Sequence, residues 1–183
     1  MSSAGRGRLL AQFPAPLRCA PPGRPKGRGA APPQTRPQRP ENCDDKGALS
    51  IAAANLNAVS LHGCTAAQAG APTSRPEAVV VGGLNATLKT YLHDALRAAG
   101  FQTIDGSTEP DLAGVEPTNI CNRMLLGKGA QLELTTELRK SMFTVNTVAG
   151  RATSTTAAYN GFVAAVRTAI ARLEASGGEQ IIL

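Results

Sequence analysis

The stretch AVVVGGLNATLKTYLHDALRAAGF, residues 78–101, predicts a strand followed by a helix. Residues 78–81 are continuously apolar and mostly β-branched, which is typical of a strand buried on both faces. Gly82 and Gly83 end this run. The leucines and alanines that follow recur three and four positions apart, as on the buried face of a helix, and Gly100 closes the helix as a C-terminal cap.

Further elements of the same two kinds lie on both sides of this stretch. The pattern predicts strands over residues 58–61, 101–104 and 130–135, a helix that ends near residue 54, a short helix or turn over 119–123, and a last helix over 156–175. Residues 64–76 and 105–118 are rich in small, polar and turn-forming residues, so loops are expected there. Strands that alternate with helices predict one layered α/β domain.

The amino-terminal segment differs sharply in composition from the rest. The formal net charge of the chain is +6, and residues 1–48 carry all of it with nine basic and three acidic side chains; they also hold nine of the thirteen prolines. Such a segment buries too little apolar surface to offset its ordering entropy. We therefore predict a disordered tail over 1–48, the α/β domain over 49–175 and a short tail over 176–183. A flexible tail without a binding role is preferred over an arm for nucleic acid or a membrane surface, because no aromatic residues are interleaved for base stacking.

Several classes of protein are disfavoured by what the sequence lacks. No apolar run approaches the roughly 20 residues of a membrane helix, and no secretory apolar core is recognised. The four cysteines have no CxxC spacing, which argues against a zinc ribbon and a disulfide framework. A cytoplasmic location is expected, with an organelle transit peptide as the minor alternative. The glycine pairs match no nucleotide-binding loop.

Five phrases occur in order along the domain: NAVSLHG, VVVGGLNATLKTYLHDALRAAGF, EPTNICNR, GKGAQLELTTELR and YNGFVAAVRTAI. Together, over roughly residues 50–173, they resemble the phage-type poly-γ-glutamate hydrolase family. The resemblance implies a three-layer, carboxypeptidase-like α/β fold with a mixed sheet and flanking helices, incomplete at the amino terminus. It also implies a zinc-dependent hydrolase that cleaves γ-glutamyl amide bonds in poly-γ-glutamate or another anionic γ-glutamyl polymer.

The resemblance also implies roles for individual residues. His62, in SLHG, matches the third zinc ligand of the family and is expected where a strand ends and a loop begins at Gly63. Glu133, in QLELT, matches the general base that takes a proton from the attacking water. Residue type and position suggest a clamp for a substrate carboxylate, formed by Asn119, Asn122, Arg123 and Lys128.

The chain departs from the family before His62, where no other histidine is found. The family's early His-Gly-Gly-x-x-Glu phrase, which supplies the other two zinc ligands, has no match, and catalytic zinc needs three protein ligands. We therefore expect this chain to be the carboxyl-terminal part of a family member whose first third was lost or replaced. We expect it to be inactive, and to associate with other molecules through an uncovered edge of its sheet. The alternatives are a non-catalytic polyanion-binding module that keeps Arg123, Lys128 and the basic tail but uses no metal, and a chain that forms no functional unit. Neither a membrane nor nucleic acid is expected as a partner, and the oligomeric state stays open.

Simpler interpretations exist for the same residues. Without the resemblance, His62 would be a hydrogen-bonded core or loop histidine and Glu133 an ordinary strand residue. The helical pattern places His93 beside Lys89 and Arg97 on a polar face, which predicts a solvated side chain. Arg139 and Lys140 are expected as a solvated surface pair.

Overall fold

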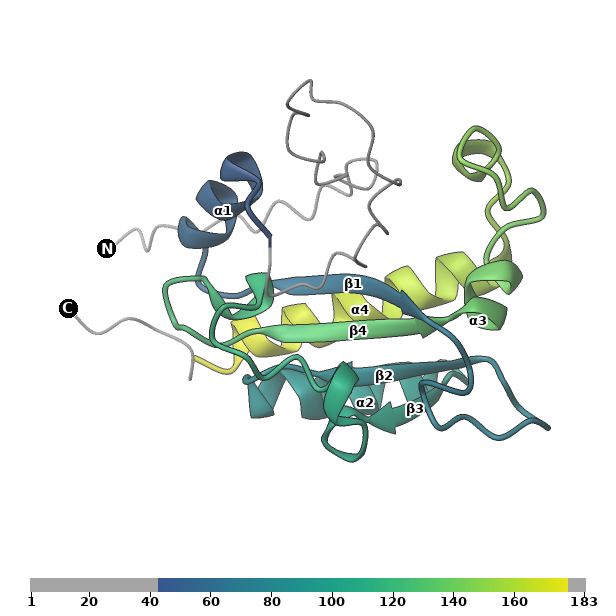
Figure 1. Cartoon of the computed structure of the whole chain (residues 1–183), viewed down its shortest axis with the longest axis horizontal. Coiled ribbons are helices and arrows are strands. Elements are labelled where there is room, and N and C mark those ends of the chain that lie inside the picture. The colour runs from purple at the N-terminus through teal and green to yellow at the C-terminus, as the bar shows by residue number, and fades with distance from the viewer. Residues whose placement is uncertain (1–42, 178–183) are drawn as a thin grey trace, which may run out of the picture.

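The centre of the molecule is a four-stranded mixed sheet (Figure 1). The computed structural model describes residues 43–177, so most of the predicted tails at 1–48 and 176–183 lie outside the described part. The strands are β1 (Val59–Cys64), β2 (Ala78–Gly82), β3 (Gln102–Asp105) and β4 (Ala130–Thr135), and their order in the sheet is β1-β4-β2-β3. β1 runs parallel to β4 and β3 runs parallel to β2, whereas β2 and β4 are antiparallel.

The predicted strands are all present, and the flanking strands explain the apolar sequence of β2. All five residues of β2 are buried, because β4 and β3 pair with its two edges and other elements cover both faces.

β1 is longer than the sequence pattern indicated. Gly63 and Cys64 continue the strand, so the expectation that a loop begins at Gly63 is wrong: their pairing with β4 keeps them extended.

Two long helices follow from capped, periodic sequences. In α2 (Ala86–Ala98), the side chain of Asn85 accepts a hydrogen bond from the backbone of Leu88, and Gly100 adopts a positive φ of 87° just after the helix. α4 (Ala157–Ala175) begins after Thr156, whose hydroxyl accepts from the backbone of Tyr159. Two shorter helices are α1 (Lys46–Ala53), which begins inside the segment assigned to the tail, and α3 (Thr136–Ser141), which the sequence pattern did not predict.

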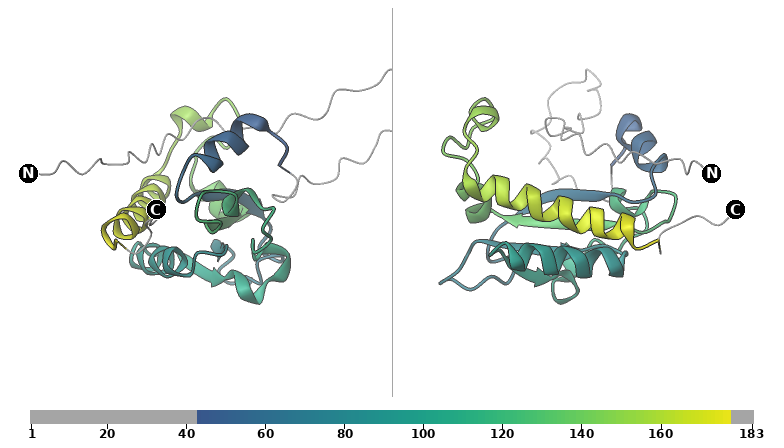
Figure 2. Two further views of the ribbon diagram at one scale, coloured as in Figure 1. Left: turned by 90° about the vertical axis from the view of Figure 1, so that its left-hand side faces the viewer. Right: turned by 180° about the vertical axis from the view of Figure 1, so that it is seen from behind.

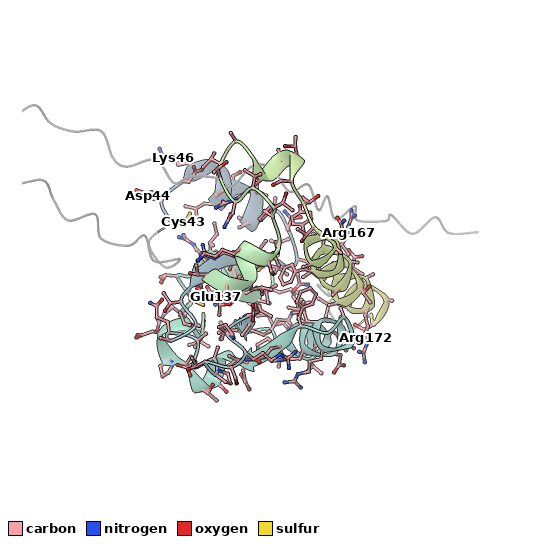
Figure 3. All side chains as sticks on the ribbon, turned by 90° about the vertical axis from the view of Figure 1, so that its right-hand side faces the viewer. Cys43, Asp44, Lys46, Glu137, Arg167 and Arg172 are labelled. Atoms are coloured by element: carbon pink, nitrogen blue, oxygen red, sulfur yellow. The ribbon has the colours of Figure 1, made fainter. Side chains whose placement is uncertain are left out.

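The two long helices lie side by side on one face of the sheet (Figure 2). Leu88, Leu92 and Leu96 of α2 are fully buried there, and each contributes about 1.5–3 kcal/mol to folding by leaving water. The main core also includes residues of β2, β4 and α4: Val79, Val81, Ala130, Leu132, Leu134, Phe162, Ala165, Val166, Ala169 and Leu173. At the surface, Arg172 of α4 pairs with Asp94 of α2 at 2.9 Å, and Figure 3 shows Arg172 on the outside of the layer.

The opposite face of the sheet is covered by loops and short 3-10 turns. A second, smaller core contains Cys64, Ala69, Val80 and Leu112. The turns between β3 and β4 are η2 (Gly106–Thr108), η3 (Pro110–Leu112) and η4 (Ile120–Asn122), and η4 confirms the predicted short turn. η5 (Arg151–Thr153) precedes α4. In the described part of the chain, no helix is long and apolar enough to cross a membrane.

Two side chains that were expected to be solvated are partly buried. His93 is half-buried against β3, and its Nδ1 lies 2.8 Å from the hydroxyl of Thr103. Arg139 is also half-buried, and its Nη2 donates to the carbonyl of Cys64 and to the hydroxyl of Thr136. The prediction of solvated side chains was therefore wrong for His93 and Arg139, because β3 and β1 pack against the faces that carry them. Lys140 is exposed as predicted.

Candidate functional site

The two residues with the sharpest predicted roles lie side by side in the sheet. His62 of β1 is the register partner of Glu133 of β4. Neighbouring strands are about 4.8 Å apart, and paired residues of parallel strands point to the same face. Two groups far apart in the sequence thus meet at one place in the fold.

These side chains point to the face opposite α2 and α4. Leu132 and Leu134 belong to the main core under the helices, so the alternating residues Gln131, Glu133 and Thr135 point the other way. That face is toward the viewer in Figure 1. The candidate site therefore lies on the loop-covered side of the sheet.

A chain of amide groups holds the Glu133 carboxylate. Nε2 of Gln131 donates to Oε1 of Glu133 at 3.1 Å and also contacts the carbonyl of Leu112 at 3.3 Å. Oε1 of Gln131 in turn accepts from Nδ2 of Asn119 at 2.7 Å. Because all three side chains are buried, these hydrogen bonds fix the orientation of the carboxylate.

Burial also changes the protonation of Glu133. Desolvation raises the pKa of this carboxyl to about 7, and the positive charge of Arg139 opposes part of the rise. Only 6% of the residue is exposed. A carboxyl that titrates near neutral pH can both take up and release a proton under physiological conditions, which is what a general base requires.

His62 offers a neutral imidazole. Burial lowers the pKa of His62, so the ring is uncharged at neutral pH. Its Nε2 atom is buried and has no hydrogen-bond partner. A buried ring nitrogen without a partner is unusual and fits a place where a metal ion or another polar group binds.

The surrounding residues do not complete a metal site. Across residues 43–177, no group of three or more His, Cys, Asp and Glu side chains could hold a metal ion. Cys64 lies on the same face as His62, but burial, together with the charge of Glu133, raises the pKa of its thiol to about 11. Without a metal ion the thiol is therefore protonated, and it would have to lose this proton to become a zinc ligand. The residues present fit part of a zinc site and not a whole one.

The predicted carboxylate clamp lies at a different place along the sheet. Asn122 Oδ1 accepts from the backbone of Gly129, which directly precedes β4, so η4 lies at the amino end of that strand. Glu133 lies three residues after Ala130, the first residue of β4, which is about 10 Å along the strand. Through Gln131, only Asn119 of this set is connected to Glu133.

The members of the clamp differ in how far they can reach a ligand. Asn122 is buried, and its Nδ2 donates to the carbonyls of Gly114 and Glu116, so its amide is already used to hold the loop. Arg123 is exposed at the end of η4, and Lys128 is half-buried. The two basic side chains are thus presented by a loop that the asparagines hold in place.

Two residues near the site were missed or misread in the sequence. Gln131 precedes Glu133 by two positions in QLELT, so its place on the same face could have been found from strand alternation alone. Arg139 lies on α3, and its guanidinium occupies the space where a Cβ on Gly63 would be. Figure 3 shows Glu137 of the same helix beside the end of the sheet, and its Oε2 is buried without a partner.

The sequence of this chain is similar to those of known proteins. The family model "Poly-gamma-glutamate hydrolase" matches residues 41–165. Two curated relatives come from Bacillus subtilis (strain 168): the SPbeta prophage-derived UPF0714 protein YoqZ is 32% identical over 110 residues, and the UPF0714 protein YndL is 29% identical over 109 residues. Each match spans 60% of this chain, but only 37% of YoqZ and 40% of YndL.

Two solved structures share the fold. A bacteriophage poly-γ-glutamate hydrolase superposes with a TM-score of 0.63 and 26% identity, covering 73% of this chain and 60% of the phage protein. A zinc-free apo structure of YndL superposes with a TM-score of 0.60 and 26% identity, covering 73% of this chain and 61% of YndL. Both proteins thus share the α/β fold of this chain over the matched parts.

Proposed function

The chain belongs to the poly-γ-glutamate hydrolase family, and we propose that its site is part of a zinc-dependent hydrolase of γ-glutamyl amide bonds that is inactive in the chain as it stands. The observation that carries this proposal is the pairing of His62 with Glu133 on one face of the sheet, where residues 43–177 provide no group of three or more His, Cys, Asp and Glu side chains that could hold a metal ion. We also propose that the wider fold is the three-layer, carboxypeptidase-like arrangement that the sequence resemblance implies.

The chemistry of the two residues supports their proposed roles. His62 has a neutral ring with an unpartnered Nε2, which suits a zinc ligand. Glu133 has a pKa of about 7 and a carboxylate oriented by Gln131, which suits a group that takes a proton from water. Zinc, when bound in such hydrolases, polarises the amide carbonyl and the attacking water.

The position of the second histidine supports the proposed loss of activity. The whole sequence contains two histidines, and His93 contacts Thr103 of β3. β1 and β3 are the opposite edges of the sheet, three strand spacings or about 14 Å apart. His93 therefore cannot join His62 in one metal site, and a single imidazole with one carboxylate falls short of three zinc ligands.

A direct test is hydrolysis of poly-γ-glutamate by the full chain in the presence of zinc. The length of the polymer is followed by size-exclusion chromatography, with and without a chelator. We expect no shortening of the polymer in either case. Shortening that the chelator abolishes, and that Glu133→Gln abolishes while Glu116→Gln does not, would show that the chain is an active enzyme.

The second candidate is a non-catalytic module that binds the polymer as a polyanion. The exposed position of Arg123 on the loop 123–129, with Lys128 on the same loop, favours this candidate. Asn119 and Asn122 would then act indirectly, by holding that loop. Salt-sensitive binding of poly-γ-glutamate without turnover, weakened by Arg123→Gln and unchanged by Arg167→Gln on the outside of α4, would support it.

A further inference from the structure

β1 is an edge strand with an open side. It pairs with β4 only, and its other main contacts in the described part of the chain are with α3 and η4. In a parallel ladder, part of the backbone N–H and C=O groups of an edge strand point away from the neighbour and can pair with another strand. Along β1, the residues that alternate with those bonded to β4 therefore present a row of such groups.

The sequence of β1 has none of the features that protect an edge. VSLHGC contains no Asp, Glu, Lys or Arg and no proline. The other edge of the same sheet is different. β3 has only four residues, ends with the carboxylate of Asp105 and runs straight into a 3-10 turn. β3 is thus protected against pairing with another strand, whereas β1 is not.

The apolar layer of the sheet also ends abruptly at β1. Leu61 and Leu132 are register partners and point to the same face, yet Leu132 is fully buried and Leu61 is 44% exposed. Val59, two residues earlier on that face, packs against the main core. A further strand beside β1 would cover Leu61 and continue the layer under the helices.

We propose that the open edge of β1 pairs with the same edge of a second copy of this chain. Antiparallel pairing about a two-fold axis perpendicular to the sheet would join two four-stranded sheets and keep the helices of both copies on one face. Because β1 has no Asp, Glu, Lys or Arg of its own, self-pairing places no like charges directly opposite each other on the two strands. The preceding residues 1–48 are a poor alternative partner, since nine of the thirteen prolines lie there and proline has no N–H to donate to a ladder.

Strand alternation limits the register of this pairing. If both helix-covered faces lie on the same side, residues of equal parity must oppose each other. Leu61 then faces Leu61, Val59 or Gly63 of the second copy, and it loses water contact in each case. The position of Leu61 is therefore the most sensitive place to disturb the interface.

The test is the mass of the full chain in solution, measured by sedimentation equilibrium over a wide concentration range. We expect a concentration-dependent dimer. Leu61→Lys should raise the dissociation constant of this dimer about tenfold to a hundredfold, because two leucines lose burial and two charges come together. Val148→Lys is the matched control: Val148 is also an exposed apolar residue, but it lies in the segment between α3 and α4, and this variant should dimerise like the wild type.

Hydrogen exchange of the wild-type chain gives a second readout that needs no variant. The amides of β1 should exchange more slowly at high protein concentration than at low concentration, while those of β3 should not change. A chain that stays monomeric at all concentrations would overturn the proposal. So would a folded Leu61→Lys variant that dimerises as tightly as the wild type. Concentration-dependent protection confined to other segments would assign association to a different surface and overturn it as well.

Discussion

Replacement of Glu133 by glutamine tests the electrostatic account of the site without any need for catalysis. The pKa of Glu133 rises from 4.5 to about 7 on folding because the carboxyl is desolvated. The folded state therefore holds this proton more tightly than the unfolded state. Its contribution to stability is fully present below pH 4.5, and it is lost as the pH rises through about 7. A neutral glutamine of similar shape removes this pH dependence.

The size of the effect follows from the change in proton affinity. A tenfold change in affinity corresponds to about 1.4 kcal/mol, so a pKa of about 7 in place of 4.5 corresponds to at most about 3 kcal/mol. Solvent screening reduces such values, and we expect about 2 kcal/mol. Above neutral pH, Glu133→Gln should thus be more stable than the wild type by about 2 kcal/mol, and the difference should shrink toward acidic pH.

Urea unfolding followed by far-ultraviolet circular dichroism measures this difference across the pH range. Glu116→Gln is the control, because it makes the same chemical change at an exposed position. The control should follow the wild type at every pH. If Glu133→Gln also follows the wild type at every pH, then Glu133 is not the buried carboxyl described above and the reasoning is refuted.

Three further predictions concern the frame around the site. Leu92→Ala, at a fully buried position of α2, should lower the free energy of unfolding by about 2–5 kcal/mol in the same urea assay, and a loss below 1 kcal/mol would contradict the packing of α2 on the sheet. Gly129→Ala should destabilise the start of β4 severely, because a Cβ at this position would overlap the backbone oxygen of Cys121. An unchanged melting temperature would show that the backbones of Gly129 and Cys121 are not this close. Burial, with the nearby charge of Arg97, lowers the pKa of His93, so His93 should contribute stability above pH 6.5 that is lost as the pH falls. His93→Gln should therefore make the free energy of unfolding less dependent on pH in this range. An equally steep dependence in the variant would contradict this prediction.

The sequence was most informative where local pattern and tertiary packing agree. The apolar run at residues 78–81 became the central strand β2, and the leucines spaced along α2 became its buried face. QLELT became β4, with Leu132 and Leu134 in the core. In these segments the side-chain period alone identifies the element, because the same residues that set the period also make the core.

Prediction failed where long-range packing overrides the local pattern. Gly63 looked like the start of a loop, but pairing with β4 keeps it in the strand. His93 shares a helix face with Lys89 and Arg97, and the sequence could not show that β3 packs against that face. α3 was missed because it has only six residues, although Thr135 caps it and Leu138 is buried in the core.

The sequence identified the residues of the site, but it could not show how they are arranged in space. A family resemblance singled out His62 and Glu133, yet alternation within QLELT could not tell which face Glu133 occupies. Their adjacency depends on the register between β1 and β4, which joins distant segments. The same holds for Gln131 and Asn119, whose amides orient the carboxylate only because η4 folds back onto β4.

The zinc content of the purified full chain tests the central claim most directly. The protein is equilibrated with zinc at neutral pH, freed of loosely bound metal and analysed by mass spectrometry of the metal. We predict far less than one zinc per chain, because His62 supplies one ligand, Glu133 is assigned to the general base, and catalytic zinc needs three protein ligands. One tightly bound zinc per chain, lost in His62→Ala and retained in His93→Ala, would contradict the account.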